Sequence, residues 1–485
     1  MIRVSTVTIV TVAVGLGVGI IGLVLGILWP SIYSSLIHKQ LSLTPTSTNY
    51  ELWKVTPIPM HLKLYMFNLT NPKEFLIGKE NPKFEEMGPY VFRETDYKVK
   101  QTWNENNTIT YQRKRVWHFN QSLSTGSLSD NVTNINPVAA SVGYTVRFSL
   151  PFFRYVADKI MKILGEELVI TKTVNELLFE GYTSEMLTLA RKVNITKIPM
   201  DKFAWFYKRN NSASYDGTFN MDTGESNMLD LGVVKEWNYN SRASSYPGQC
   251  GVISGTNGDL WPPLPDNDTV SFFLSDICTS MSAKYFGKTV HEDLPGVTYI
   301  SDDTIFDNGT KVPSRKCYYQ GESIPSGAMN ISSCKWGAPA FISLPHFYLA
   351  DPIYTENIDG MNPQKEKHQL SISIEPKTGV PLKVSAQMQL NMMVDSYENM
   401  TTFQNMKKIF IPMLWFTQEA NLTANYASTV KFIIILQTLG SVTCFGIAGI
   451  GIIVLFIGIF VIIKNGMKNE DNEQLISTSR LNGDM

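Results

Sequence analysis

The sequence has no excess of charge of either sign. Its 485 residues include 42 lysines and arginines against 43 aspartates and glutamates, which gives a formal net charge of −1. Binding to the phosphate backbone of nucleic acids depends on clustered positive charge, and this balance does not supply it in bulk. We therefore expect no nucleic-acid partner.

The sequence also lacks the common signatures of catalysis. It contains no Gly-x-Ser-x-Gly and no His-Glu-x-x-His, and its six histidines show no metal-ligand spacing. The triplet Gly287–Lys288–Thr289 resembles the end of a phosphate loop, but Ser282 stands where that loop requires its first glycine. We predict no catalytic, cofactor or metal residue and no enzyme. A hydrolase whose catalytic residues are scattered along the sequence would show no such motif, because catalytic triads are recognised by their geometry.

Two long runs without a charged residue are present, one near each end of the chain. They extend from Val4 to Leu28 and from Phe432 to Ile463, and about 20 apolar residues suffice to cross a bilayer core. A cleaved signal peptide is the alternative for the first run, but Trp29 and Pro30 follow it where small residues would be expected. The predicted organisation is a tail at 1–5, a transmembrane helix at 6–29, one large domain at 30–431, a transmembrane helix at 432–463 and a tail at 464–485.

Small residues recur at four-residue spacing in the first run. Gly15 and Gly19 form one pair, and Gly22 and Gly26 form another. Close backbone contact is a main route to helix association in lipid, so these pairs predict pairing of the two runs or self-association into a homo-oligomer. Ordinary glycine usage in membrane helices is the alternative, and the sequence leaves the choice open.

Glycosylation sequons place the large domain outside the cytoplasm. All eleven Asn-x-Ser/Thr sequons lie between the two apolar runs, and none lies in a tail. This confinement predicts a domain in the lumen of the secretory pathway or outside the cell, with both tails cytoplasmic. The candidate glycosylation sites are Asn68, Asn106, Asn120, Asn131, Asn194, Asn210, Asn267, Asn308, Asn330, Asn399 and Asn421.

Strand patterns dominate the large domain. From Leu382 to Leu390 apolar and polar residues alternate, which predicts a strand with one buried face. Leu370–Ile374 alternates in the same way, and Glu375–Gly379 between the two reads as a turn, so a hairpin is predicted here. Thr108–Phe119 also looks extended.

One helical region, from Pro151 to about Lys192, interrupts the strands. Apolar residues recur there at three- and four-residue spacing. Thr173 and Glu176 form a capping box, which predicts a second helix. Lys159, Lys162 and Lys172 are candidate contacts for an anionic ligand, and a solvated helix face is the alternative for each of them.

The cysteines divide into two groups. Cys250, Cys278, Cys317 and Cys334 lie in the large domain, where an oxidising compartment favours disulfides, and their spacing leaves all three pairings open. Cys444 lies inside the second apolar run. We interpret it as a packing residue, with lipidation as the alternative.

The C-terminal tail contains a candidate sorting signal. Asp471 stands four positions before the pair Leu475–Ile476. An apolar pair suits a pocket of a clathrin adaptor, and the nearby carboxylate suits a basic patch on it. The tail therefore predicts endosomal or lysosomal sorting.

Several strings of the large domain resemble those of class B scavenger receptors, the family of the fatty-acid translocase and the lysosomal integral membrane protein. They occur in the expected order between the two apolar runs. The strings are YMFNLTNP at 65–72, GPYVFRE at 88–94, FLSDIC ending at Cys278, SLPHFYLADP at 343–352, IDGMNPQKEKH at 358–368, IEPKTG at 374–379 and IPMLWF at 411–416.

The resemblance implies an α+β fold: a β-barrel-like domain with an apical helical bundle at 151–192, held by two transmembrane helices. It also implies an apolar tunnel that leads lipid to the membrane, and disulfides joining Cys250 to Cys317 and Cys278 to Cys334. Some members have a third, local disulfide. Here Tyr319 stands near one of its positions and no partner cysteine is present.

Three functions follow from these observations. The leading hypothesis is a receptor that binds lipids or lipoproteins and conducts lipid to the membrane. The alternative is a receptor that carries a soluble luminal protein to lysosomes by its apical helices. A two-helix ligand-gated channel shares the topology but lacks the family strings.

Overall fold

The computed structural model describes residues 6–193, 200–264, 268–319 and 322–481. The chain divides into two compact units. One consists of residues 1–40 and 425–485, and we call it the helix unit. The other consists of residues 41–424, and we call it the barrel domain.

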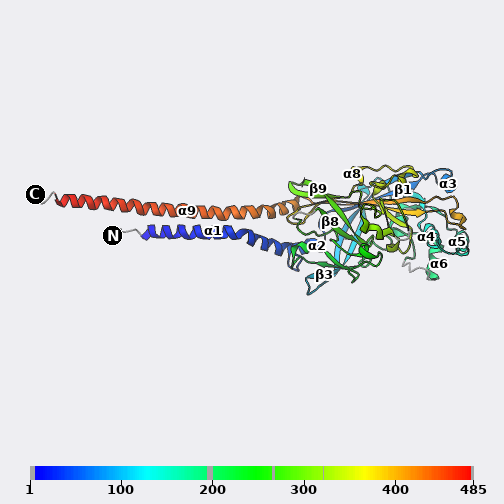
Figure 1. Ribbon diagram of the computed structural model, residues 1–485, viewed down its shortest axis with the longest axis horizontal. Helices are drawn as coiled ribbons and strands as arrows, with labels where there is room; N and C mark the ends of the chain where they lie inside the picture. Colours follow the sequence, from blue (N-terminus) through cyan, green and yellow to red (C-terminus); the bar gives the residue numbers. More distant parts are fainter. Residues whose placement is uncertain (1–5, 194–199, 265–267, 320–321, 482–485) are drawn as a thin grey trace. The chain divides into compact units, whose positions relative to one another are not determined.

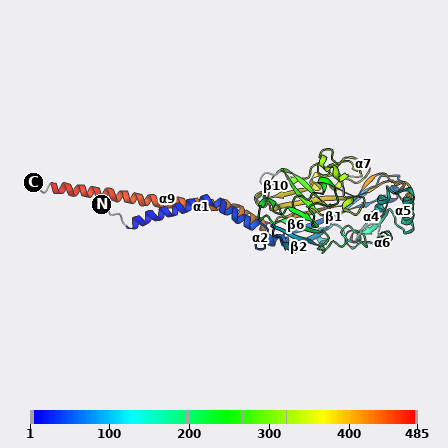
Figure 2. The same cartoon turned by 60° about the horizontal axis from the view of Figure 1, so that its bottom comes forward.

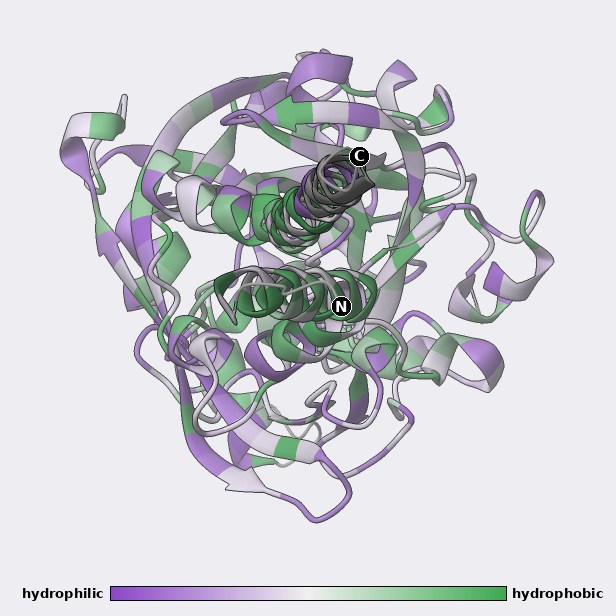
Figure 3. Ribbon diagram, turned by 90° about the vertical axis from the view of Figure 1, so that its left-hand side faces the viewer, coloured by the Kyte–Doolittle hydropathy of each residue, from purple (hydrophilic) through white to green (hydrophobic). Residues whose placement is uncertain are grey.

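Two long helices, α1 (Thr6–Leu41) and α9 (Ala424–Leu481), form the helix unit. Both contain segments long and apolar enough to cross a membrane, with mean hydropathies of 2.5 and 3.0. Figure 3 shows hydrophobic residues along both helices. The first apolar run, from Thr6 on, therefore forms the first part of α1, and the second run is the central part of α9.

The two helices touch through their backbones at the small residues. A methyl group added at Gly22 would lie 2.4 Å from the backbone N of Ala448, and one at Gly451 would lie 2.3 Å from the N of Gly19. The indole of Trp29 also donates a hydrogen bond of 3.1 Å to the carbonyl of Gln437. The structure thus supports a role for the glycines in close packing, and specifically in the pairing of α1 with α9. Cys444 lies at this contact, since its carbonyl faces Gly22.

The barrel domain is built on one 13-stranded sheet in which all neighbouring strands are antiparallel. The main path runs β7-β6-β3-β2-β1-β15-β14-β13-β10-β9-β8, and β11 and β12 branch from β14 (Figures 1 and 2). Thr256 bridges to Val233 beside β7 and to Phe272 in β8, so one short segment joins the two ends of the path. The sheet is thereby nearly closed into a barrel. The strands are β1 Met60–Leu69, β2 Phe84–Trp103, β3 Thr108–Phe119, β6 Thr218–Asp222, β7 Val234–Trp237, β8 Thr269–Leu274, β9 Thr279–His291, β10 Leu294–Ile300, β11 Ala328–Asn330, β12 Ala340–Ser343, β13 Ser371–Ile374, β14 Pro381–Val394 and β15 Ile409–Asn421.

The predicted hairpin is confirmed, with one correction. Strands β13 and β14 pair in register from Ser371 and Ser385 onward. The polar face of β14 points to solvent only at its start, where Lys383 is exposed; further along, Gln389 and Asn391 are fully buried. The side chain of Gln389 accepts a hydrogen bond from the backbone N–H of His346, so a second layer of chain covers this face. Alternation of apolar and polar residues cannot reveal this burial, because a glutamine or asparagine gives the same pattern whether it is exposed or buried with hydrogen bonds.

The helical region is shorter and more mixed than predicted. Helix α5 covers Pro151–Ile163 and α6 covers Glu185–Lys192, but Val169–Thr173 between them is strand β5, paired with β4 (Asn131–Ile135). The capping box forms, since Glu176 accepts from the backbone N–H of Thr173, but it opens only a π-helical turn at Glu176–Glu180. Local capping chemistry thus did not predict the pairing with a distant strand.

Helices α4 (Pro137–Val146), α5 and α6 gather at one end of the barrel domain (Figures 1 and 2). We call this the helical end. The other helices of the domain are short: α2 Thr48–Lys54, α3 Pro72–Leu76, α7 Ile353–Glu356 and α8 Lys365–His368. The observed architecture is the expected α+β fold, a barrel-like sheet with a terminal helical bundle.

Two disulfides lie in the barrel domain. One joins Cys250 to Cys317 and the other joins Cys278 to Cys334. The hydroxyl of Tyr319 lies 3.2 and 3.0 Å from the carbonyl oxygens of Phe306 and Ala328, to which it can donate its one proton. A half-buried phenol therefore holds this loop by a hydrogen bond.

Candidate binding cavity

The barrel domain encloses a mainly apolar cavity of about 170 Å³. One water molecule accounts for about 30 Å³ of liquid volume, so the space is larger than a packing defect. Its apolar lining consists of Leu62, Trp117, Pro137, Met200, Phe203, Ala204, Trp205, Phe206, Ile277, Ile331, Trp336, Ala338, Ala340, Ile342, Met388, Leu390, Met392, Leu414 and Phe416.

The floor of the cavity follows from the two-residue period of neighbouring strands. Met388, Leu390 and Met392 of β14 all line it. On β15, Leu414, Phe416 and Gln418 do the same, and the two strands are in register, with Leu390 opposite Leu414. The alternation along β14 predicted that one of its faces is buried. The apolar side chains of that same face form this floor.

An aromatic wall faces the cavity from β3 and from the segment 200–215. Trp117 of β3 packs edge-on against Phe206, with ring centroids 5.8 Å apart. Phe203 and Trp205 form a second perpendicular pair at 4.9 Å. Such pairs are favourable beyond the area they bury. The indole N–H of Trp117 also donates a hydrogen bond of 2.8 Å to Glu94, which fixes the ring.

A cluster of charged residues interrupts the apolar lining. Asp216 binds two arginines: its Oδ2 accepts from Arg115 Nη2 at 2.6 Å, and its Oδ1 accepts from Arg209 Nη2 at 2.8 Å. Arg209 also binds both carboxylate oxygens of Asp276, at 2.7 and 2.8 Å. Arg115, Arg209, Asp276 and Lys335 line the cavity, so one charged patch lies in its wall.

The ion pairs keep the carboxylates charged despite their burial. Burial alone would raise the pKa of Asp276, but Arg209 and Arg115 outweigh it and hold the pKa well below its usual range. The same two arginines lower the pKa of Asp216 against its burial. Both aspartates are therefore ionised at any physiological pH.

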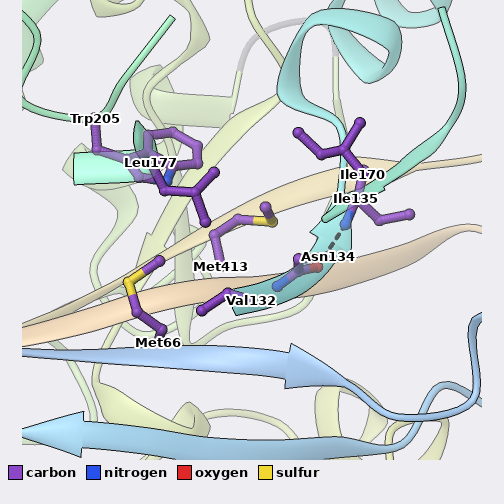
Figure 4. A pocket seen from close by; sticks show the side chains of 8 residues that line it. All are labelled: Met66, Val132, Asn134, Ile135, Ile170, Leu177, Trp205 and Met413. Carbon is purple, nitrogen blue, oxygen red and sulfur yellow. Dashed lines mark hydrogen bonds between the residues drawn. The ribbon is translucent and has the colours of Figure 1, made fainter. Parts of the chain in front are cut away.

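A second, smaller apolar space of about 10 Å³ lies next to the cavity on the side of β4 and β5. Figure 4 shows Met66, Leu177, Trp205 and Met413 among its lining side chains. Asn134 also borders it, but its amide group is fully used, since it donates to the carbonyls of Phe67 and Pro412 and accepts from Ile135 N–H. Trp205 lines both spaces and thus separates them.

The predicted ligand lysines lie outside the cavity. Lys162 of α5 pairs with Asp158 at 3.1 Å, and Lys172 of β5 lies 4.0 Å from Glu176. Lys159 is exposed and sits over the ring of Tyr155 at 5.3 Å. Two of the three lysines therefore have local carboxylate partners, and their role in ligand binding stays a prediction.

The sequons and the sorting signal are only partly covered by the structure. Asn194 and Asn267 lie outside the described residues, and so do the side chains of Leu475 and Ile476. Asp471 is exposed near the end of α9. Among the sequons in the described ranges, Asn330 is buried in β11 with 8% of its surface exposed.

Sequence reasoning missed the charged cluster. Arg115 stands in a strand among polar residues, and Arg209 and Asp216 lie in a segment without clear periodicity. A local signal did exist for the other two members, because Asp276 precedes Cys278 by two positions and Lys335 follows Cys334 directly. The disulfide between Cys278 and Cys334 brings these two charged residues close together, so the disulfide pairing would have indicated their proximity.

Comparison with known proteins agrees with this architecture. The family model described as the CD36 family matches residues 11–462. Protein peste of Drosophila melanogaster is 32% identical over 85% of this chain and 75% of its own length. Scavenger receptor class B member 1 of Cricetulus griseus is 32% identical over 84% of this chain and 80% of its own. Lysosome membrane protein 2 of Rattus norvegicus is 32% identical over 82% of both chains.

These matches bear on the class of protein as well as the fold. They cover both helices of the helix unit as far as residue 462 and the whole barrel domain. The two terminal apolar helices fit a two-span membrane topology. The relatives are scavenger receptors and lysosome membrane proteins, which are receptors rather than enzymes. The chain therefore belongs to the CD36 family, the class B scavenger receptors, and is a membrane receptor of the lipid- and lipoprotein-binding kind.

Proposed function

We propose that the protein captures lipid or a lipoprotein and passes lipid through the barrel cavity towards the bilayer. In this proposal residues 6–29 and 432–463 span the membrane and residues 30–431 lie outside the cytoplasm. Residues 1–5 and 464–485 form the two cytoplasmic tails.

The observation that carries the proposal is a row of side chains on β15 that line two neighbouring, mainly apolar spaces. Met413 lines the small space, and Leu414, Phe416 and Gln418 line the cavity in sequence. Leu414 to Gln418 covers about 13 Å at about 3.3 Å per residue. The strand then ends at Asn421, close to the end of the barrel domain at Ala424. The lining thus runs along β15 from beside β4 and β5 to Gln418, three residues before the strand ends.

Blocking the cavity tests the proposal. Leu390→Trp adds a large ring to the cavity floor, and Lys383→Trp places the same ring on an exposed position of the same strand. We expect uptake of a fluorescent lipid by expressing cells to fall about tenfold with Leu390→Trp, a loss equivalent to about 1.4 kcal/mol. Uptake with Lys383→Trp should match the unaltered protein at equal surface expression. Equal uptake by both variants would remove the cavity from the route.

A second candidate, a sorting receptor for a soluble luminal protein, is favoured by the helical end. Phe148, Phe152 and Ile163 expose 78%, 68% and 81% of their surface there. Large exposed apolar residues in one region are typical of protein–protein contacts. Lys159, Lys162 and Lys172 would lie around such a contact, and the exposed Lys159 is the best placed to reach an acidic partner.

The tail provides a separate test of the sorting role. Replacing Leu475 and Ile476 with alanine removes the apolar pair that a clathrin adaptor would bind. The protein should then move from lysosomes to the cell surface, as measured by surface biotinylation and imaging. A matched change of Leu481 to alanine, outside the signal, should leave the distribution unchanged. A lysosomal double variant would show that this signal does not direct sorting.

A further inference from the structure

The hairpin of β9 and β10 exposes large apolar side chains. Phe286 and Val290 expose 60% and 72% of their surface, and the exposed Lys288 lies between them. In β10 the exposed Pro295 lies directly opposite Val290. We call Phe286, Lys288, Val290 and Pro295 the hairpin patch. Large apolar residues gathered on one exposed segment are typical of an interaction surface.

The hairpin is packed against the strands that lead into α9. A methyl group at Gly296 would lie 2.5 Å from Cδ1 of Leu382, a fully buried residue of β14. His291 Nε2 lies 3.1 Å from the carbonyl oxygen of Leu422, two residues before α9 begins at Ala424. The hairpin also lies at the end of the barrel domain opposite the helical end (Figures 1 and 2). Its turn is therefore held where the chain passes into α9.

The apolar run of α9 brings this point close to a bilayer. From Phe432 to Ile463 the helix measures about 48 Å, whereas a hydrocarbon core is about 30 Å thick. Phe432 and Ile435 at the outer end of the run expose 61% and 50% of their surface, so this end is favoured in lipid. Tilting or local thickening of the bilayer accommodates such a long run. Ala424 is then at most about 12 Å along the helix from the core, next to a head-group layer about 5–8 Å deep.

The edge of the hairpin limits how deep it can lie. β8 pairs with β9 as far as Lys284, and the backbone N–H of Tyr285 donates to the carbonyl of Asp268. From Phe286 on, β10 is the only strand that pairs with β9 within the described residues. Peptide groups along such an edge need water or lipid head groups as partners, and the hydrocarbon core offers neither. The hairpin therefore suits the head-group layer and not the core.

The charges around the patch balance one another. Lys288 follows Phe286 in β9, and Lys365 Nζ of α8 lies 5.5 Å from the centre of the Phe286 ring. Glu292 and Asp293 are exposed at the turn of the same hairpin. Two cations therefore face two anions, and attraction to charged lipids is not favoured. Burial of apolar surface is the term that would drive a contact with lipid.

We propose that the hairpin patch lies on the bilayer surface and gives the protein a third membrane contact in addition to α1 and α9. Phe286 and Val290 bury their side chains among the lipid head groups, and Lys288 extends its ammonium group to the phosphates. Three contacts fix the orientation of the barrel domain over the membrane, which two helices alone do not. This inference rests on the two-span topology and not on the proposed lipid route, whose test with Leu390→Trp gives its result independently.

Fluorescence quenching by spin-labelled lipids tests the contact directly. The full-length protein carries Cys444→Ala, so that an added cysteine is the only free thiol, and an NBD fluorophore is attached at Phe286→Cys. In phosphatidylcholine nanodiscs its emission should fall when the nitroxide is on the head group, and fall less when the nitroxide is at the end of the acyl chain. The control is Ile77→Cys, 64% exposed beside α3 towards the helical end, which should keep its emission (Figure 1).

A second set of variants separates apolar contact from mere nearness to the bilayer. A label at Lys288→Cys should be quenched from the head group, and adding Phe286→Ser with Val290→Ser should abolish this quenching. Ile77→Ser, the matched change, should leave it intact, and so should replacing part of the phosphatidylcholine with phosphatidylserine. The proposal is overturned if Phe286→Cys keeps its emission, if the chain-end nitroxide quenches it more strongly, if the double serine variant is still quenched, or if quenching requires phosphatidylserine.

Discussion

The most unusual side chains of the barrel domain after the cavity cluster are two stacked histidines. His346 and His368 lie 4.6 Å apart between ring centroids, both at 5% exposure or less. The backbone N–H of Asn362 donates to His346 Nδ1, so the Nε2 of that ring carries the proton and donates to Glu86 at 2.6 Å. The Nδ1 of His368 accepts from the backbone N–H of Gln364. Both rings are thus arranged as neutral imidazoles.

The pair gives the domain an acid-sensitive element. Burial, the neighbouring His346 and Lys367 lower the pKa of His368 to about 4, although Glu86 opposes them. In the unfolded chain His368 titrates near its ordinary pKa of 6.5. The unfolded state therefore binds the proton first as the pH falls, and the native state loses stability between about pH 6.5 and 4.

We predict that the melting temperature of the full-length protein in detergent is lower at pH 5 than at pH 7.5. The contribution of His368 is on the order of 1–2 kcal/mol after allowance for solvent screening. His368→Gln should reduce the difference in melting temperature between the two pH values. His118→Gln, at an exposed position of β3, serves as the control. An equal pH dependence in both variants would exclude His368 as the acid-sensitive group.

At the scale of elements, the contact of α1 with α9 depends on the absence of side chains. A methyl group at Gly22 would lie 2.4, 2.8 and 2.9 Å from backbone atoms of Ala448 and Cys444, and backbone cannot rotate away as a side chain can. Gly446 of α9 has no atom within 4 Å of such a methyl group and offers a matched control.

Gly22→Leu should therefore separate the two helices, whereas Gly446→Leu should not. The measurement is fluorescence energy transfer in cells between a donor on the N-terminal tail and an acceptor on the C-terminal tail. We expect lower transfer for Gly22→Leu, because tight contact of small residues is what drives association in lipid. Unchanged transfer would show that the helices are held together by something other than this contact.

At the scale of the whole molecule, the proposed topology makes a prediction about glycans. Glycans should occur only within residues 30–431, and they should be absent from Asn330, whose side chain is packed in β11 and accepts a hydrogen bond from the backbone N–H of Ser332. Asn106 is exposed between β2 and β3 and should be occupied. Mass spectrometry after enzymatic glycan removal shows whether Asn106 and Asn330 carried a glycan. A glycan on Asn330 in the folded protein would contradict the packing of β11.

The layout of the molecule could be predicted from sequence because its signals are local. The two uncharged runs, the sequons between them and the alternation along β13 and β14 each depend on neighbouring residues only. Strand β5 was not predictable in this way, because its partner β4 lies some 35 residues earlier along the chain. The buried face of Gln389 and Asn391 was missed for the same reason, since the chain that covers it comes from elsewhere.

The sequence by itself determined that two apolar helices flank, along the chain, a large domain that contains all the sequons, because hydrophobicity and sequons depend on a few neighbouring residues. The sequence strings shared with class B scavenger receptors indicated which fold this domain has. Only the tertiary structure decided that Arg115, Arg209, Asp276 and Lys335 meet at one cavity, since they come from four separate segments. Charge balance is a property of neighbours in space. A net charge of −1 for the chain therefore gave no indication of the charged cluster in the cavity wall.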